Sequence, residues 1–434
     1  MRRVALSRFV AMVVASALGV ALPAVPAAGQ RDRDKHDRGN VDGTLVIGSL
    51  APETGDFSSI VESLRVPVQL AVQEINDAGG ADGKPVTLVT GDDGSSADVA
   101  STTLTRMLET DKVDAIVGPA SSPTTLGILT AIRTGRVLTC SGSNTAAELS
   151  TAKSDGYYFR TSPPDRLQGP ALAELVRSDG HKKVGILARD DAYGLELDTS
   201  LKEALTAGRA KIVADVTYNP AGSSFGRAVR KIAAKKPDAV VVIGFDDDGA
   251  KVLQAMVAEG IGPANVPVYT VDGMQSARFA GLVDAADPAK VAGIKGTQPA
   301  LAPAGVDSPF PAKLAATGTD PVFSAYYYDC TILIALAAEK AKSDDPTKMK
   351  KVFAQNLEGK RDCNTYADCK NLLDRGKTIH WRGASSNFDT FGKFEPKEGV
   401  YDVWSYDAAG KVQIEDSSSQ IKIGGPSTHK AGGK

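Results

Sequence analysis

The sequence has few of the residues on which metal and redox chemistry depend. It contains four histidines and four cysteines in 434 residues, and no histidine lies near a cysteine at the spacing of zinc ligands. The 50 basic and 52 acidic residues leave a formal charge of −2, which provides no basic field for nucleic acid and no net attraction to an acidic membrane. Aromatic residues make up only 6% of the chain, which disfavours a platform for stacking sugars or binding quaternary amines.

Signatures of common enzymes are also missing from the turns where they would be expected. The turns "GSSAD" and "SGSNT" do not form the Gly-x-Ser-x-Gly nucleophile elbow. No Gly-x-Gly-x-x-Gly follows the first predicted strand, so a dinucleotide site is unsupported. His181 and His380 fall outside the strand-end turns, which leaves Cys140 and the serines without a base. We therefore predict a protein that is not an enzyme and has no cofactor and no metal.

The N-terminal segment predicts export. Residues 1–29 combine arginines, the apolar run Phe9–Leu22 and small residues at Ala27–Gly29, which is the pattern of a cleaved signal peptide. A membrane anchor is the alternative, but the apolar run is short and prolines close it. Residues 30–42 are charged and predict a disordered spacer. No cysteine stands near the cleavage region for lipid attachment, so the predicted location is periplasmic, cell-surface or extracellular.

An exported protein can form disulfides. Cys363 and Cys369 are close together in the polar segment "CNTYADC", which predicts a local bridge. Cys140 and Cys330 lie far apart in the sequence, and they are either two buried thiols or a second bridge.

From Thr44 onward, predicted strands and helices alternate along two series of similar size. "TLVIGSL", "PVTLVTGDD", "VDAIVGP" and "VLTC" are strands of the first series, and "KVGILARDD", "KIVADVTYN", "AVVVIGFDD" and "VPVYTVDG" are strands of the second. This alternation predicts an α/β fold with two Rossmann-like lobes, each built on a parallel central sheet. The residues after Glu415 are of low complexity and predict a disordered tail, 416–434.

Ligands of open α/β sheets bind beyond the carboxyl ends of strands, so these turns predict the site. The turns of the first series are rich in hydroxyls and amides, as in "GPASSPTTL" and "CSGSNTAAEL". Those of the second series carry carboxylates and a tyrosine, as in "RDDAYGLEL" and "GFDDDGAKVL". Simple helix caps explain single residues of this kind. The division between the lobes suits a zwitterion, whose carboxylate needs hydroxyls and helix N-termini and whose ammonium needs an acid.

Several segments resemble periplasmic binding proteins of the leucine/isoleucine/valine type, which serve ABC transporters. The resemblance runs in order through "VIGSLAPETGDF", "IVGPASSPTTLGIL", "CSGSNTAAELS", "YFRTSPPDRLQGPALAELV" and "DDAYGLEL", and it covers residues 44–415. It implies the type I periplasmic binding protein fold, with lobes joined by a multi-strand hinge. The expected lobes are 43–162 plus 273–386 and 163–272 plus 387–415, with hinge crossings near 161–165, 272–273 and 386–389.

The resemblance also implies roles for individual residues. Ser143 and Thr145, with nearby backbone N–H groups, would hold the ligand carboxylate, and Asn144 between them would belong to the same site. Ser121 and Ser122 would flank the ligand. An aromatic residue of the first turn would make an apolar contact, a tyrosine would wall the second lobe, and an aspartate there would accept from the ligand ammonium. These residues are Ser121, Ser122, Ser143, Asn144, Thr145, Phe57, Tyr193 and Asp246, or a neighbour of Asp246 in the run to Asp248, with Asp272 as a second candidate for the ammonium. Cys140 and Gly142, which stands where the family usually has proline, depart from the pattern.

The implied function is capture of a small polar ligand between two closing lobes and delivery to the membrane permease of an ABC transporter. A branched-chain or other aliphatic amino acid is the expected ligand, and a monomer is the expected state. The alternative is a ligand-sensing protein for an amide or small organic acid that reports to a signalling partner.

Overall fold

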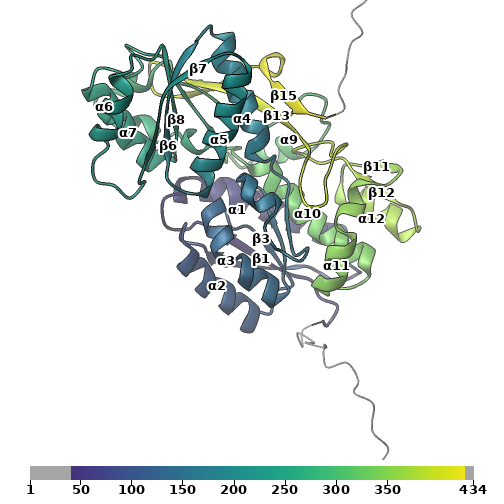
Figure 1. Ribbon diagram of the computed structural model, residues 1–434. Coiled ribbons are helices and arrows are strands. Elements are labelled where there is room, and N and C mark those ends of the chain that lie inside the picture. Colours follow the sequence, from purple (N-terminus) through teal and green to yellow (C-terminus); the bar gives the residue numbers. More distant parts are fainter. Residues whose placement is uncertain (1–40, 426–434) are drawn as a thin grey trace, which may run out of the picture. The chain divides into compact units, whose positions relative to one another are not determined.

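The computed structural model describes residues 41–425 (Figure 1). The predicted signal peptide, most of the predicted spacer and the end of the predicted tail lie outside the described residues. Within them, no helix is both long and apolar enough to cross a membrane. The described chain begins at the end of the predicted spacer, where the backbone N–H groups of Asp42 and of the next residue, Gly43, donate to the carboxylate of Asp344 at 2.9 and 2.7 Å.

The first lobe is built on a five-stranded sheet in the order β2-β1-β3-β4-β5. Every neighbouring pair in it is parallel. The strands are β1 Val46–Ala51, β2 Thr87–Asp92, β3 Ala115–Val117, β4 Leu138–Ser141 and β5 Tyr158–Arg160. The central strands β3 and β4 are buried along their whole length, as expected for a parallel sheet covered on both faces by helices.

The helices of the first lobe come from two distant parts of the sequence. They are α1 Val61–Asp77, α2 Ala97–Glu109, α3 Ser122–Gly135, α9 Phe310–Ala315, α10 Ser324–Ala341, α11 Pro346–Val352 and α12 Tyr366–Asp374. Helix α10 packs against α1, α11, α12 and β4. Its residues 324–339 are all buried, which agrees with an almost uniformly apolar sequence that shows no polar face. The segment Tyr326–Asp329 is therefore part of the core.

The second lobe is built on an eight-stranded sheet in the order β14-β13-β10-β9-β8-β6-β7, with β15 also paired to β13. The strands are β6 Lys183–Arg189, β7 Lys211–Tyr218, β8 Ala239–Ile243, β9 Val268–Thr270, β10 Lys295–Pro299, β13 Glu398–Tyr406, β14 Val412–Ile414 and β15 Ile421–Gly424. Its helices are α4 Asp165–Ser178, α5 Ala192–Ala207, α6 Gly226–Ala233, α7 Asp246–Ala258 and α8 Phe279–Asp284. The sheet is parallel from β7 to β10, and β13, β14 and β15 add antiparallel strands.

One predicted lobe boundary is wrong. Residues 273–299, expected in the first lobe, belong to the second, because β10 pairs with β9 and β13. The second crossing between the lobes therefore follows Pro299 and does not lie at 272–273. The strand Lys295–Pro299 has a single β-branched residue and ends in proline, so its sequence carries little strand signal.

The predicted disordered tail is also partly wrong. Residues Ser417–Ser419 form a 3₁₀ helix, η6, and β15 pairs antiparallel with β13. The side chains of Ile421 and Ile423 pack against a small apolar cluster that includes Leu167 and Tyr401. Residues 421–424 thus form a strand because they pair with the edge of β13, which their local composition did not predict.

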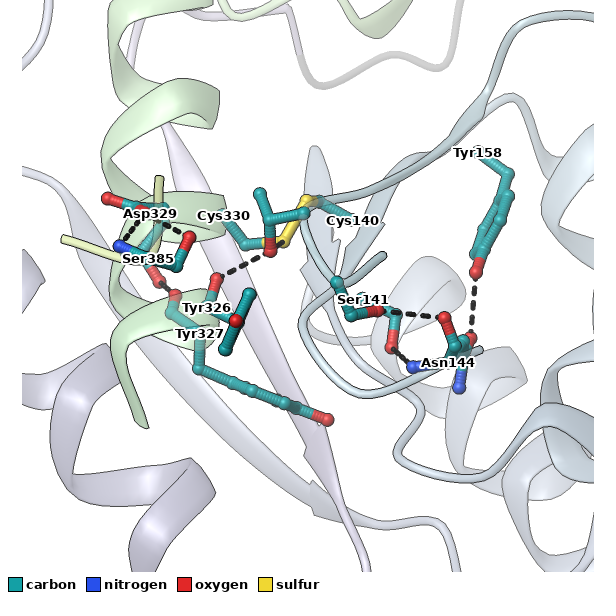
Figure 2. Close-up of a disulfide and its surroundings, with 12 residues drawn as sticks. Cys140, Ser141, Asn144, Tyr158, Tyr326, Tyr327, Asp329, Cys330 and Ser385 are labelled. Atoms are coloured by element: carbon teal, nitrogen blue, oxygen red, sulfur yellow. Dashed lines mark hydrogen bonds between the residues drawn. A yellow bond between two sulfur atoms is a disulfide. The ribbon is translucent and has the colours of Figure 1, made fainter. Parts of the chain in front are cut away.

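The four cysteines form two disulfides. Cys363 pairs with Cys369, as predicted, and Cys140 pairs with Cys330 across 190 residues. Figure 2 shows the second bridge joining the end of β4 to α10. The remaining short elements are β11 Arg361–Cys363, β12 Ile379–Trp381 and the 3₁₀ helices η1 Ser58–Ile60, η2 Ala147–Ser150, η3 Asp272–Met274, η4 Pro288–Val291 and η5 Ala354–Leu357.

Candidate functional site

The hydroxyl-rich turn after β4 is held in shape by its own polar groups. The Ser141 hydroxyl donates to the backbone oxygen of Pro119 at 2.8 Å and accepts from the backbone N–H groups of Ser143 and Asn144. The Ser122 hydroxyl accepts from the backbone N–H groups of Thr145 and Ala146 at 3.2 and 3.1 Å. The turn after β4 and the start of α3 therefore form one hydrogen-bonded unit.

Asn144 belongs to the framework of this turn. Its amide nitrogen donates to the backbone oxygens of Pro119 and Ala120, and its amide oxygen accepts from the hydroxyls of Thr125 and Tyr158. Figure 2 shows the contact with Tyr158. These four hydrogen bonds use the full capacity of an amide, so its predicted contact with a ligand gains no support from the geometry.

The remaining hydroxyls of the first lobe are buried and differ in their partners. Ser121 caps α3, accepting from the backbone N–H of Thr124 at 3.3 Å. The Ser143 hydroxyl donates to the backbone oxygen of Ala120 at 2.7 Å and lies 3.0 Å from the Tyr327 hydroxyl. The simple capping role weighed against ligand binding therefore holds for Ser121, and Ser143 forms part of a hydroxyl pair.

Gly142 allows this turn to approach α10. A Cβ atom at residue 142 would lie 2.5 Å from the Cδ2 atom of Tyr327 and 2.7 Å from its backbone nitrogen. The family usually has proline at this position. Here glycine replaces it, and Tyr327 packs directly against the turn.

Two buried carboxyl groups, Asp272 and Asp165, mark the facing part of the second lobe. An oxygen of Asp272 accepts from the Gln168 amide at 2.6 Å and from the Tyr193 hydroxyl at 3.0 Å. Burial raises the pKa of Asp272 to about 6, and these two hydrogen bonds oppose that rise. Tyr193, at the start of α5, is therefore beside the acid that was predicted as the second candidate.

Asp165, at the start of α4, was not predicted as a site residue. Burial raises its pKa well above the ordinary value, and the negative charge of Asp272 adds to that rise. The Thr145 hydroxyl approaches this carboxylate and favours its ionised form, but it does not complete a hydrogen bond, and both carboxylate oxygens lack a partner. The backbone N–H of Asp165 donates to the oxygen of Thr145 at 2.7 Å, which brings the hydroxyl turn and the acids together.

The aspartates of "GFDDDG" are already paired. Both carboxylate oxygens of Asp246 accept from Arg278, at 2.7 and 3.0 Å. Asp248 accepts from Arg189 at 2.8 Å and from the Tyr218 hydroxyl at 2.5 Å. The contact between Asp246 and a ligand ammonium stays a prediction. In the structure the carboxylate of Asp246 already has a positively charged partner, Arg278.

An aromatic stack joins the two lobes. The ring of Phe57 stacks on that of Phe245 with centroids 4.7 Å apart, and Phe245 stacks on Tyr193 at 5.2 Å. The guanidinium of Arg189 lies 3.8 Å from the centroid of the Phe245 ring. The sequence pattern identified Phe57 and Tyr193 and missed Phe245 and Arg189, although Phe245 lies in the turn after β8 and Arg189 is the last residue of β6.

The fold and this arrangement define a two-lobed binding protein, with a hydroxyl turn on one lobe and buried acids on the other. The sequence family described as periplasmic binding protein matches residues 44–361. The chain therefore belongs to the periplasmic binding protein family, whose members are exported.

Two relatives and one solved structure show which members of the family the chain is similar to. The chain is 27% identical to the chemotactic signal transduction substrate-binding protein BasB of Halobacterium salinarum, over 82% of this chain and 85% of that protein. It is 27% identical to the Leu/Ile/Val-binding protein BraC3 of Rhizobium johnstonii, over 54% of this chain and 63% of that protein. The solved structure of the branched-chain amino acid transporter substrate-binding protein LivJ of Streptococcus pneumoniae, in complex with isoleucine, superimposes with a TM-score of 0.69 at 26% identity, covering 87% of this chain and 99% of that one.

Proposed function

We propose that this protein captures a branched-chain or other aliphatic amino acid between its lobes and delivers it to the permease of an ABC transporter. It acts as a binding protein without catalysing a reaction. The names of the Rhizobium relative and of the Streptococcus structure support this ligand class. Export by a cleaved signal peptide over residues 1–29 belongs to the same proposal.

The observation that carries the proposal is the pair of buried carboxyl groups of Asp165 and Asp272. A buried carboxylate without a partner is costly, and a cation placed beside it removes much of that cost. The ammonium group of an amino acid is such a cation. The hydroxyl turn of the first lobe lies on the facing side, and the hydroxyls of Ser122 and Thr145 donate hydrogen bonds to the carboxylate of the ligand.

The aromatic stack supports an apolar side chain on the ligand. Phe57 and Phe245 contact each other directly, and an aliphatic group inserted beside or between their rings gains contact on both lobes at once. Such contacts stabilise the closed arrangement, because a ligand shifts an equilibrium only by its extra interactions in one state.

The direct test is isothermal titration of the full chain with leucine and with two truncated analogues. 4-Methylpentanoate lacks the ammonium group of leucine, and isopentylamine lacks its carboxylate. We expect leucine to bind and each analogue to lose at least about tenfold in affinity, because one charge-assisted group is missing from each. Analogues that bind as tightly as leucine would contradict recognition of a zwitterion.

Single substitutions show whether Asp272 or Asp246 contacts the ammonium group of the ligand. Asp272→Asn should weaken leucine binding by at least about tenfold and leave 4-methylpentanoate nearly unaffected, because only the ammonium contact is removed. Asp190→Asn, at an exposed aspartate, is the charge-matched control. If Asp246→Asn removes leucine binding and Asp272→Asn does not, the ammonium contact belongs to Asp246, as the resemblance implied.

A second candidate function is sensing, and the chemotactic relative from Halobacterium favours it. The same closing motion would then report to a signalling partner. Uptake of labelled leucine by the native cell, with and without this gene, distinguishes the two functions. Uptake that depends on the gene supports transport, whereas unchanged uptake with a lost behavioural response supports sensing.

A further inference from the structure

A cavity of about 900 Å³ opens on the first lobe, and none of its lining residues belongs to the candidate site described above. Its walls are the loop between η2 and β5, helix α11 and the segment 391–397 that leads into β13. This volume lies within the range of small-molecule pockets.

The charge of this cavity is strongly uneven. Five lysines line it, namely Lys153, Lys350, Lys351, Lys393 and Lys397, whereas Asp155 and Glu358 are its only acids. Among the described residues, none of these five lysines forms an ion pair, and Asp155 pairs with Arg133 instead. Elsewhere in the protein lysines such as Lys202 and Lys370 do pair with carboxylates. The cavity therefore concentrates positive charge in a chain with a net charge of −2.

The same cavity has an aromatic wall that is held in place. Phe159 and Phe394 meet edge to face with centroids 5.5 Å apart, and Phe391 completes the wall. The backbone oxygen of Phe394 accepts from the N–H of Arg160 at 2.9 Å. The ammonium of Lys350 donates to the backbone oxygen of Asp155 at 2.7 Å and lies 3.6 Å from the ring centroid of Tyr157. The cationic and aromatic groups are thus partly preorganised, which reduces the entropy cost of binding.

We propose that this cavity is a second binding site, for a small molecule that carries a phosphate or carboxylate group on an aromatic body. Several ammonium groups without carboxylate partners favour an anion by direct charge-assisted hydrogen bonds. The phenylalanine wall favours a ring, since aromatic pairs add to the gain from burying apolar surface. This second site shares no residue with the site proposed for the amino acid between the lobes.

The test is isothermal titration of the full chain at 150 mM NaCl with 1-naphthyl phosphate, 1-naphthoate and inorganic phosphate. We expect one of the two naphthyl anions to bind at least about tenfold more tightly than inorganic phosphate, and the better of the two identifies the anionic group. The triple variant Lys351→Gln, Lys393→Gln, Lys397→Gln should lower that affinity by at least about tenfold, because exposed ammonium groups that contact the anion are lost.

A matched variant tests the location. Lys231→Gln, Lys235→Gln, Lys251→Gln removes the same charge from exposed lysines of the second lobe and should change the affinity by less than about twofold. The proposal is overturned if neither naphthyl anion binds, if inorganic phosphate binds equally well, or if the two triple variants lose affinity equally. Saturating leucine that displaces the naphthyl anion would also overturn the proposal, because the probe would then occupy the site proposed for the amino acid.

Discussion

At the residue scale, Asp272 combines a cost in stability with a role in binding. Its carboxyl is buried, and its pKa is raised from 3.8 to about 6. The folded protein therefore holds this proton at pH values where the unfolded chain has released it. Such burial is expected where a site needs an unneutralised charge for its ligand.

The first prediction concerns the stability of Asp272→Asn without ligand. The pKa of Asp272 is higher in the folded protein than in the unfolded chain. Ionisation of Asp272 therefore lowers the stability of the wild-type protein as pH rises from about 4 to about 6, and this loss stays constant at higher pH. Asparagine does not ionise and keeps the oxygen that accepts from Gln168 and Tyr193. The variant should therefore gain about 2–3 kcal/mol relative to wild type between pH 4 and pH 7.5. Urea unfolding at both pH values measures this, and a difference that does not change with pH would contradict it.

The second prediction concerns Gly142, where the close approach of Tyr327 leaves no room for a Cβ atom. Gly142→Ala should cost about 1–3 kcal/mol, because the turn or the tyrosine must shift, and it should weaken leucine binding by displacing the turn that carries Thr145. Gly281→Ala in α8 is the matched control, since a Cβ there meets no atom within 4 Å. Equal effects of the two substitutions on urea unfolding would show that the steric argument is wrong.

At the scale of elements, helix α10 organises the first lobe. It carries Cys330 of the long-range disulfide and also Asp329, whose carboxylate accepts from the Ser385 hydroxyl (Figure 2). The same carboxylate accepts from the Trp381 indole. Through these groups one helix connects β4, β12 and the last chain segment before the second lobe. Its burial on all sides explains why an apolar run in the sequence became a central helix.

The third prediction compares the two disulfides. In the chain-entropy model a bridge stabilises more when it closes a longer loop, about 5 kcal/mol for the separation of 190 residues and about 2 kcal/mol for that of 6. Cys140→Ala with Cys330→Ala should therefore destabilise the protein more than Cys363→Ala with Cys369→Ala. Urea unfolding of the two double variants without reductant tests the order, and a larger loss from the local bridge would reverse it.

At the scale of the whole described chain, three crossings join the lobes, at 161–164, 300–309 and 382–397. Between these crossings the lobes meet through Phe57, Phe245 and Tyr193. This contact between the lobes favours closure, and a ligand must improve on it or replace it.

The fourth prediction follows from this contact. Phe57→Ala should shift the ligand-free protein toward a more open arrangement, because the stack with Phe245 is worth about 0.5–1.5 kcal/mol beyond its buried area. Small-angle X-ray scattering should detect a larger radius of gyration for this variant without ligand. Leu195→Ala, at an exposed side chain of α5, should leave the radius unchanged. If Phe57→Ala has the same radius as wild type, the stack does not influence closure.

Much of the fold was predictable because it depends on local signals. The buried β-branched run of β8 and the cap of α3 by Ser121 are readable from a few neighbouring residues. The candidate site was only partly predictable. Tyr193 and Asp272 follow strands of the expected pattern and lie together, whereas Asp165 begins a helix and becomes a site residue only through its proximity to Asp272 and Thr145.

The sequence by itself determined the α/β alternation, the two lobes, the hydroxyl turn of one lobe, the place of Asp272 at a strand end of the other and the local disulfide. Each of these depends on residues near one another in the chain, where propensity and pattern act directly. The tertiary structure alone decided the pairing of Cys140 with Cys330, the place of β10 in the second lobe, the strand β15 and the pairing of Asp246 with Arg278. These depend on contacts between distant segments, whose energies are set by packing and burial once the chain has folded.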